Sequence, residues 1–208
     1  MNLKIKFKTI LSVLLASILL FMLSAFPMAA QTTTYKVVKG DSMWKIAVRY
    51  QVGISEIIAA NPQITNPALI YPDQIITIPL PNASVTAFEQ EVVKLVNQTR
   101  KANGLKELTV NWELARVARY KSQDMHDKRY FSHTSPTYGS PFTMMKNFGI
   151  TYRTAGENIA MGYTTPRSVF DGWMNSPGHR ANILNAGYRQ IGVGFFEEGY
   201  YWTQMFIG

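Results

Sequence analysis

Three side chains in the second half of the chain have the types that commonly bind a divalent metal ion or exchange protons. They are His133, Glu157 and His179, and each is flanked by Gly, Ser or Pro. Two imidazoles and a carboxylate are a common ligand set for Zn²⁺ or a similar ion, with open positions for water. We predict that loops or helix edges bring the three side chains together in one cleft.

Each of the three side chains also has a structural alternative. His133 could bridge loop carbonyl groups through its ring nitrogens. Glu157 could accept backbone N–H groups and brace its own loop, because a buried carboxylate needs such donors or a cation. His179 could contact Glu157 from the start of a short helix. The residues leave these alternatives open beside a metal or ligand site.

The rest of the sequence does not complete a familiar catalytic set. It contains no Cys, no Gly-x-Ser-x-Gly turn and no His-Glu-x-x-His helix, which excludes a cysteine nucleophile, a serine elbow and a zinc-peptidase helix. Glu157 as a general base, with His133 and His179 holding a metal-bound water, is the enzymatic alternative. Enzymatic activity is therefore left open, and a binding function is favoured.

The segments that carry these side chains lie among helical patterns and two late strands. Thr86–Glu89 has the form of a capping box before an amphipathic run, and Asn111 can cap a second helix. Further helices are expected at 142–148, from Thr165-Pro166 onward and around 179–184, and strands at 191–195 and 201–206. Helices mixed with adjacent strands predict an α+β fold for residues 86–208.

Several phrases of this unit occur in an order that is typical of one known family. They are YFSHTSP (130–136), AGENIAMGY (155–163), VFDGWMNSPGHRANILN (169–185), IGVGF (191–195) and YWTQMF (201–206). Together they resemble the CAP superfamily, also called the SCP-like domain, in its bacterial form. The resemblance implies an α-β-α sandwich with an antiparallel sheet, and an extracellular location.

The same resemblance bears on the three candidate side chains. The family has a cavity typically formed by two His and two acidic groups; His133 and Glu157 match its FSH and GEN motifs, and His179 matches the bacterial SPGHR motif. Two positions depart from the animal and plant members, because Tyr201 stands where they have His and Ser176 where they have an acidic residue. The full set of four is absent, which weakens the metal site that the resemblance implies. Any Zn²⁺ or other divalent cation would have His133, His179 and Glu157 as its ligands.

The segment before this unit predicts a small module with two strands and two helices. A strand at Tyr35–Val38 precedes a turn in which Asp41 or Ser42 can cap a helix through Tyr50. A second helix, capped by Ser55, closes at Asn61-Pro62, and a second strand spans 75–79. This β-α-α-β segment resembles the LysM module along its whole length, which implies binding of N-acetylglucosamine glycans, mainly peptidoglycan or chitin.

The resemblance places the glycan groove on two loops of the module. The matching positions here are Gly40, Asp41, Ser42, Met43, Asn61, Pro62, Ile64, Leu69 and Ile70. Turn N–H and C=O groups can bond acetamido groups, while small apolar side chains accept the N-acetyl methyl and the sugar faces. The structural alternative is that Asp41 and Ser42 are helix caps and that Ile64 and Leu69 belong to the core.

The N-terminus has the pattern of an export signal. Lys4, Lys6 and Lys8 precede an uncharged stretch from Ile10 to Phe26, and small residues follow at Ala29 and Ala30. We expect a signal peptide at 1–30, a LysM domain at 34–80, a linker at 81–85 and a CAP/SCP-like domain at 86–208. After signal cleavage, no stable membrane insertion is expected.

Composition limits the partners. The 208 residues carry a formal charge of +8, but no Lys/Arg run or basic–aromatic pattern that would follow a nucleic-acid backbone. No nucleic-acid partner is expected. The export signal and the two resemblances together imply a secreted, extracellular or cell-wall-associated protein that binds peptidoglycan through LysM and presents a CAP domain to an unknown ligand. The combination resembles secreted proteins of spore-forming bacilli, which implies a role in sporulation or envelope assembly. The alternative is a metal-assisted hydrolase of wall polymers or peptides.

Overall fold

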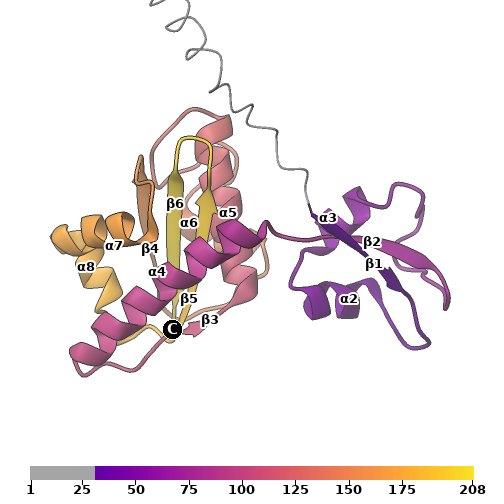
Figure 1. The fold of residues 1–208 in the computed structure, drawn as a ribbon, viewed down its shortest axis with the longest axis horizontal. Coiled ribbons are helices and arrows are strands. Elements are labelled where there is room, and N and C mark those ends of the chain that lie inside the picture. The colour runs from indigo at the N-terminus through magenta and orange to yellow at the C-terminus, as the bar shows by residue number, and fades with distance from the viewer. Residues whose placement is uncertain (1–30) are drawn as a thin grey trace, which may run out of the picture.

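The computed structural model describes residues 31–208, which form two units joined at the start of a long helix (Figure 1). The first unit contains β1 (Thr32–Lys36), α2 (Met43–Tyr50), α3 (Ile54–Ala59) and β2 (Ile75–Pro79). Strands β1 and β2 pair antiparallel. The predicted β-α-α-β order is confirmed, and the Ser42 side chain caps α2 by accepting a bond from the Lys45 N–H.

An isoleucine core holds the first unit together. Ile46 on α2, Ile57 on α3, and Ile76 and Ile78 on β2 are completely buried. Alternate residues of β2 face this core, as a half-buried strand requires. So short a segment encloses only a small core, and few of its apolar side chains can change without loss of stability.

The second unit consists of five helices and four strands, counted over the described residues. They are α4 (Ala83–Ala102), β3 (Thr109–Val110), α5 (Trp112–Asp127), α6 (Pro141–Asn147), β4 (Ala155–Met161), α7 (Pro166–Asn175), α8 (Pro177–Ile183), β5 (Gln190–Phe196) and β6 (Tyr201–Ile207). The sheet order is β3-β5-β6-β4. The three long strands are antiparallel, and short β3 is parallel to β5.

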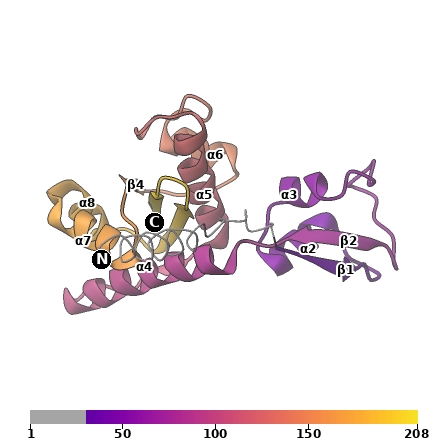
Figure 2. The same cartoon turned by 45° about the horizontal axis from the view of Figure 1, so that its top comes forward.

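The sheet lies between two layers of helices, with α4, α7 and α8 on one face and α5 and α6 on the other (Figure 2). Trp202 and Phe206 of β6 pack on the first layer, and Met205, between them in sequence, packs on the second. The predicted α-β-α sandwich is therefore confirmed.

A glycine allows α5 to pack unusually close to the sheet. A Cβ atom added to Gly194 of β5 would lie 2.1 Å from the carbonyl carbon of Ala118. No larger residue fits there unless helix and strand separate. The IGVGF phrase thus describes a site of close backbone approach.

Several elements differ from the sequence-based expectation. Helix α3 begins at Ile54 with Gly53 at its N-cap, so Ser55, the predicted cap, lies inside the helix and does not cap it. Glu157 lies in the middle of β4, where a loop was predicted; its polar neighbours obscured the strand, which pairs along its whole length with β6. Helix α4 begins at Ala83, capped by Asn82, so residues 83–85 of the predicted linker are helical. The Thr86–Glu89 capping box is not used, because Glu89 is buried and accepts bonds from Arg119 and from the Phe195 N–H.

The predicted signal peptide, residues 1–30, lies outside the described residues. Within 31–208, no helix has the length and apolar composition needed to cross a bilayer.

Candidate functional site

His133 and Glu157 form a direct pair at the surface of the second unit. The His133 Nδ1 atom lies 2.7 Å from Glu157 Oε1. Glu157 stands opposite Met205 in the β4–β6 register, and therefore points to the α5 side of the sheet. The Glu157 side chain is 1% exposed and that of His133 is 51% exposed. The Glu157 carboxyl group is thus buried, and the His133 imidazole lies between it and the solvent.

The environment of Glu157 favours its neutral form. Burial raises the pKa of the Glu157 carboxyl, and the His133 hydrogen bond and the nearby charges of Lys121 and His133 offset this only in part. Its second oxygen, Oε2, is buried and has no hydrogen-bond partner among residues 31–208. A buried oxygen of this kind is satisfied by a proton, a water or a donor group of a ligand.

His179 lies near this pair but is not bonded to it. Burial, followed by the charge of His133, lowers the pKa of the His179 ring. Within residues 31–208, no hydrogen bond joins that ring to His133 or Glu157; the backbone oxygen of His179 accepts one from Asn158. The ring lines a cavity of about 310 Å³ together with Phe131, Met161 and other apolar side chains.

These positions bear on the predicted metal site. No three His, Cys, Asp or Glu side chains of the described residues are arranged to hold a metal ion. Ser176, which stands where an acidic residue was expected, lines the His179 cavity and adds no carboxylate to it. The described residues therefore do not supply a three-ligand Zn²⁺ set in this arrangement, and a cleft shared by all three side chains stays a prediction.

The loop that carries His133 is anchored by a completely buried lysine. Lys121 Nζ donates to the Ser132 carbonyl at 2.8 Å, to the His133 carbonyl at 2.9 Å and to the Tyr130 hydroxyl at 3.0 Å. All three donors of the ammonium group are therefore used. Two of these bonds hold the backbone at His133 itself, so Lys121 positions the imidazole over Glu157.

Asp124 anchors the same loop, one helical turn after Lys121. Its carboxylate accepts bonds of 2.6 Å from the hydroxyl groups of Tyr130, Ser135 and Thr137. Burial alone would raise the pKa of Asp124, but these hydrogen bonds outweigh it and lower the pKa. The loop is therefore bound to α5 by one buried cation and one buried anion.

Sequence reasoning missed both anchors. A signal was present, because Lys121 falls on the buried stripe of α5 with Leu114, Val117, Ala118 and Met125. A charged residue in such a stripe must be paired or hydrogen-bonded. Asn182 of α8 anchors the backbone of β4 by donating to the Glu157 carbonyl.

The predicted glycan-binding residues divide into exposed and buried sets. Gly40, Ser42, Pro62 and Leu69 are exposed, Asp41 and Ile70 are half-buried, and Met43, Asn61 and Ile64 are buried. Asn61 is structural, because its amide bonds the Ile57 and Thr77 carbonyls and accepts from the Thr77 N–H.

The structural alternatives hold for only some of the glycan residues. Ser42 is a helix cap, and Ile64 belongs to the core. Asp41 braces its turn by accepting from the Val38 N–H and from the Tyr35 hydroxyl. Leu69, in contrast, is 55% exposed and is not part of the core. The exposed subset leaves a surface on two loops that a glycan could contact.

Comparisons with known proteins identify both units. Residues 93–206 match the family model described as "Cysteine-rich secretory protein family", CAP, and residues 35–79 match the LysM domain model. The chain is 60% identical over 126 residues to the uncharacterized protein YkwD of Bacillus subtilis, covering 61% of this chain and 49% of YkwD. The chain thus spans about half of that relative.

Three further proteins are similar to parts of the chain. A segment of 43 residues is 49% identical to SpoIVD-associated factor A of B. subtilis and covers 21% of this chain and 11% of that protein. A Bacillus anthracis extracellular protein with an SCP domain is 33% identical, with a TM-score of 0.58 over 65% of this chain and 47% of that one. A Staphylococcus aureus cysteine-rich secretory protein, 22% identical with a TM-score of 0.52 over 63% of this chain and 41% of that one, shares the fold.

Proposed function

Because the chain belongs to the CAP family and carries a LysM domain, we propose that it is a secreted, cell-wall-associated protein that binds peptidoglycan. The LysM domain holds N-acetylglucosamine glycans, and the CAP domain presents the His133–Glu157 site to a ligand. The observation that carries the proposal is the LysM match at 35–79, with the exposed loop residues Gly40, Ser42, Pro62 and Leu69. Extracellular relatives of the CAP unit support the location.

The chemistry of the CAP site supports binding rather than turnover. The buried Glu157 carboxyl has one oxygen bonded to His133 and one with no partner. An unpaired buried oxygen carries a desolvation penalty, and a ligand that donates a hydrogen bond to Oε2 would remove that penalty. The exposed His133 ring can contact the same ligand from above.

The peptidoglycan proposal is tested by sedimentation of the exported chain, residues 31–208, with purified peptidoglycan. Leu69→Ala removes an exposed apolar side chain from the predicted groove and is expected to reduce retention about fivefold or more. Ile75→Ala is the matched control, because Ile75 is 53% exposed on β2 and lies outside the groove. Failure of the unmodified chain to sediment with peptidoglycan defeats the proposal.

A hydrolase of wall polymers or peptides is the second candidate, with Glu157, His133 and His179 as its residues. Its support is the raised pKa of Glu157, since perturbed carboxyl groups are common at catalytic sites. The test is turnover of labelled wall fragments and of casein, with and without added Zn²⁺. Turnover that disappears in Glu157→Gln supports the hydrolase; unchanged turnover removes Glu157 as a base.

A role in sporulation or envelope assembly is proposed on narrower ground. Its support is the similarity of one short segment to a protein named for its association with SpoIVD. A deletion strain of the source organism that forms normal, fully resistant spores would remove this part of the proposal.

A further inference from the structure

The two units are bonded to each other by one polar cluster. Arg116 of α5 donates to both carboxylate oxygens of Glu56 on α3, at 2.6 and 2.8 Å. The Tyr120 hydroxyl also donates to Glu56, and Arg116 donates to the Ser55 hydroxyl. Bidentate, charge-assisted bonds of this kind fix direction as well as distance. The cluster therefore sets the angle at which the LysM unit faces α5.

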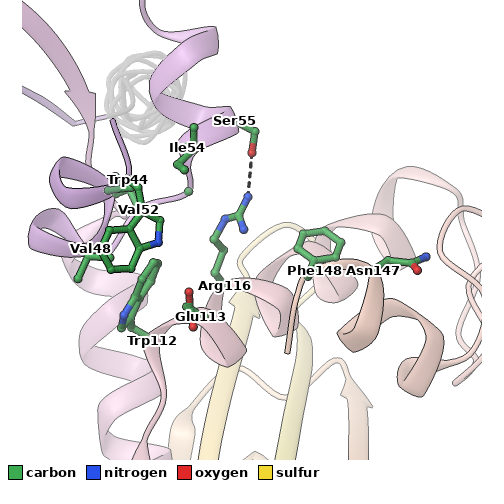
Figure 3. Close-up of a pocket in the computed structure, with 12 residues that line it drawn as sticks. Trp44, Val48, Val52, Ile54, Ser55, Trp112, Glu113, Arg116, Asn147 and Phe148 are labelled. Atoms are coloured by element: carbon green, nitrogen blue, oxygen red, sulfur yellow. Dashed lines mark hydrogen bonds between the residues drawn. The ribbon is translucent and has the colours of Figure 1, made fainter. Parts of the chain in front are cut away.

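A groove of about 400 Å³ lies beside this cluster, between the two units (Figure 3). Trp44, Val48 and Ile54 form its LysM wall, and Trp112 and Glu113, at the start of α5, form part of its CAP wall. The volume is in the range of small-ligand sites, which often occur at domain interfaces.

The two tryptophans are the distinctive feature of the groove. Trp44 is 61% exposed, although indole is the largest apolar side chain of this small module. Trp112 is half-buried on the opposite wall. In Figure 3 the two indoles lie near each other, one from each unit. An indole offers an electron-rich face that attracts polarised C–H groups, and one N–H donor at its edge.

We propose that this groove is a saccharide subsite that takes further sugar rings of the glycan held by the LysM turn. This inference rests on the proposed function. Trp44 follows directly after Met43 and the predicted glycan residues 40–42, so one glycan chain can reach both the LysM turn and the groove. A pyranose ring has an apolar C–H face for the indoles and hydroxyl or acetamido groups for Glu113 and Asn147, which also line the groove.

The charges of the groove favour a neutral sugar over an acidic stem peptide. The Arg116 guanidinium is already bonded to Glu56 on two sides. Glu113 adds a carboxylate to the lining and would repel the carboxylates of a stem peptide. Neutral glycan rings meet no such repulsion. The LysM and CAP units thereby form one continuous binding surface, which neither would form alone.

Binding in the subsite can be measured by tryptophan fluorescence, because few of the tryptophans are accessible to a quencher. Of the four tryptophans, Trp173 and Trp202 are completely or almost completely buried. In the full exported chain with Trp44→Phe, Trp112 is therefore the one indole accessible to a quencher. Chitohexaose is expected to reduce acrylamide quenching of this variant about twofold or more. A ligand confined to the LysM turn would leave the quenching unchanged.

Affinity measurements by calorimetry complete the test. Trp112→Ala is expected to weaken chitohexaose binding about tenfold while leaving chitobiose binding unchanged, and Trp112→Phe should restore most of the affinity. Phe142→Ala, an exposed aromatic on α6 outside the groove, is the control. Melting curves check that each variant is folded.

The outcomes separate the two proposals. The subsite is overturned, and LysM binding stands, if two results occur together. Chitohexaose binds the unmodified chain and Trp112→Ala with equal affinity, and it does not protect Trp112 from acrylamide quenching. Protection of Trp112 by a free stem peptide but not by chitohexaose also overturns the subsite. If no saccharide binds the unmodified chain, both proposals are wrong.

Discussion

Lys121 and Asp124 are the residues on which the geometry of the His133–Glu157 pair depends. Both are buried charges whose hydrogen bonds end on the loop that carries His133. The motif FSH identified His133, and the motif GEN identified Glu157, because these short phrases are recognisable in the sequence. The anchors were not predicted, since their partners lie 6 to 13 residues away and meet only after the loop folds back on α5.

Lys121→Met is expected to loosen the loop and to destabilise the protein by about 2–3 kcal/mol. The substitution keeps the length of the side chain but leaves the Ser132 and His133 carbonyls without their donor. Urea unfolding measures the stability, and the NMR signals of the His133 ring report its order. Lys128→Met, at an exposed position after α5, is the control and should change neither. Unchanged His133 signals in Lys121→Met would remove Lys121 as a positioning residue.

Glu157 should give stability an unusual dependence on pH. The pKa of Glu157 is raised in the folded protein, so folding favours the protonated carboxyl. This contribution to the free energy of unfolding is complete below the pKa of the unfolded chain. It is lost as pH rises through the pKa of the folded protein. Glu157→Gln should therefore gain stability relative to the parent chain as the pH rises above about 4, the ordinary pKa range of a glutamate. A stability difference that stays constant as the pH rises contradicts the buried-carboxyl account.

Asp124 should act in the opposite direction. Its pKa is lowered in the folded protein, so its contribution is present above the unfolded pKa and is lost as pH falls through the folded pKa. Asp124→Asn is expected to destabilise the chain by about 2 kcal/mol at neutral pH and by much less in acid. Denaturant titrations at both pH values measure this, and an equal loss at both would show that the charge does not matter.

At the scale of elements, caps made the helices predictable and pairing made one strand unpredictable. Ser42 and Asn111 cap helices as expected, because a side chain that bonds its own turn is a local signal. Ser55 does not cap α3, which begins one residue earlier, at Ile54. Strand β4 has Gly, Glu and Asn in its first half, and its seven residues become a strand because β6 pairs with all of them. Such tertiary pairing outweighs local preference.

The close packing of α5 on β5 can be tested by a substitution that adds one methyl group to Gly194. Gly194→Ala is expected to destabilise the protein by about 2 kcal/mol or more, because the new Cβ would meet the α5 backbone. Gly178→Ala, where no atom lies within 4 Å of the new Cβ, is the matched control and should be close to neutral. Thermal unfolding compares the two, and equal melting temperatures would refute the close approach.

At the scale of the whole molecule, the sequence predicted two domains in the right order but not their contact. Glu56 and Arg116 are separated by 60 residues and belong to no shared motif. Neither side chain carries a local signal that it pairs across a domain boundary. Pro81 and Asn82 indicated a linker, whereas the structure shows that helix α4 begins at Ala83 and that the Arg116–Glu56 ion pair joins the two units.

Arg116→Ala should release the LysM unit from α5. The two units would then be joined by residues 80–82 and by the single Tyr120–Glu56 hydrogen bond, and small-angle X-ray scattering should show a wider distribution of interatomic distances. Arg167→Ala is the control, because Arg167 pairs only with exposed Asp171 on its own helix. An unchanged scattering profile for Arg116→Ala would mean that other contacts set the angle.

The central claim is that acetamido-bearing glycans hold this protein on the cell wall. The most direct measurement is sedimentation of residues 31–208 with peptidoglycan stripped of anionic polymers, before and after chemical N-deacetylation. We predict strong retention at high salt on the native polymer and loss of retention after deacetylation. Equal retention on both, or retention that disappears with salt, would mean that the net charge of the chain binds it to the wall and would contradict the account.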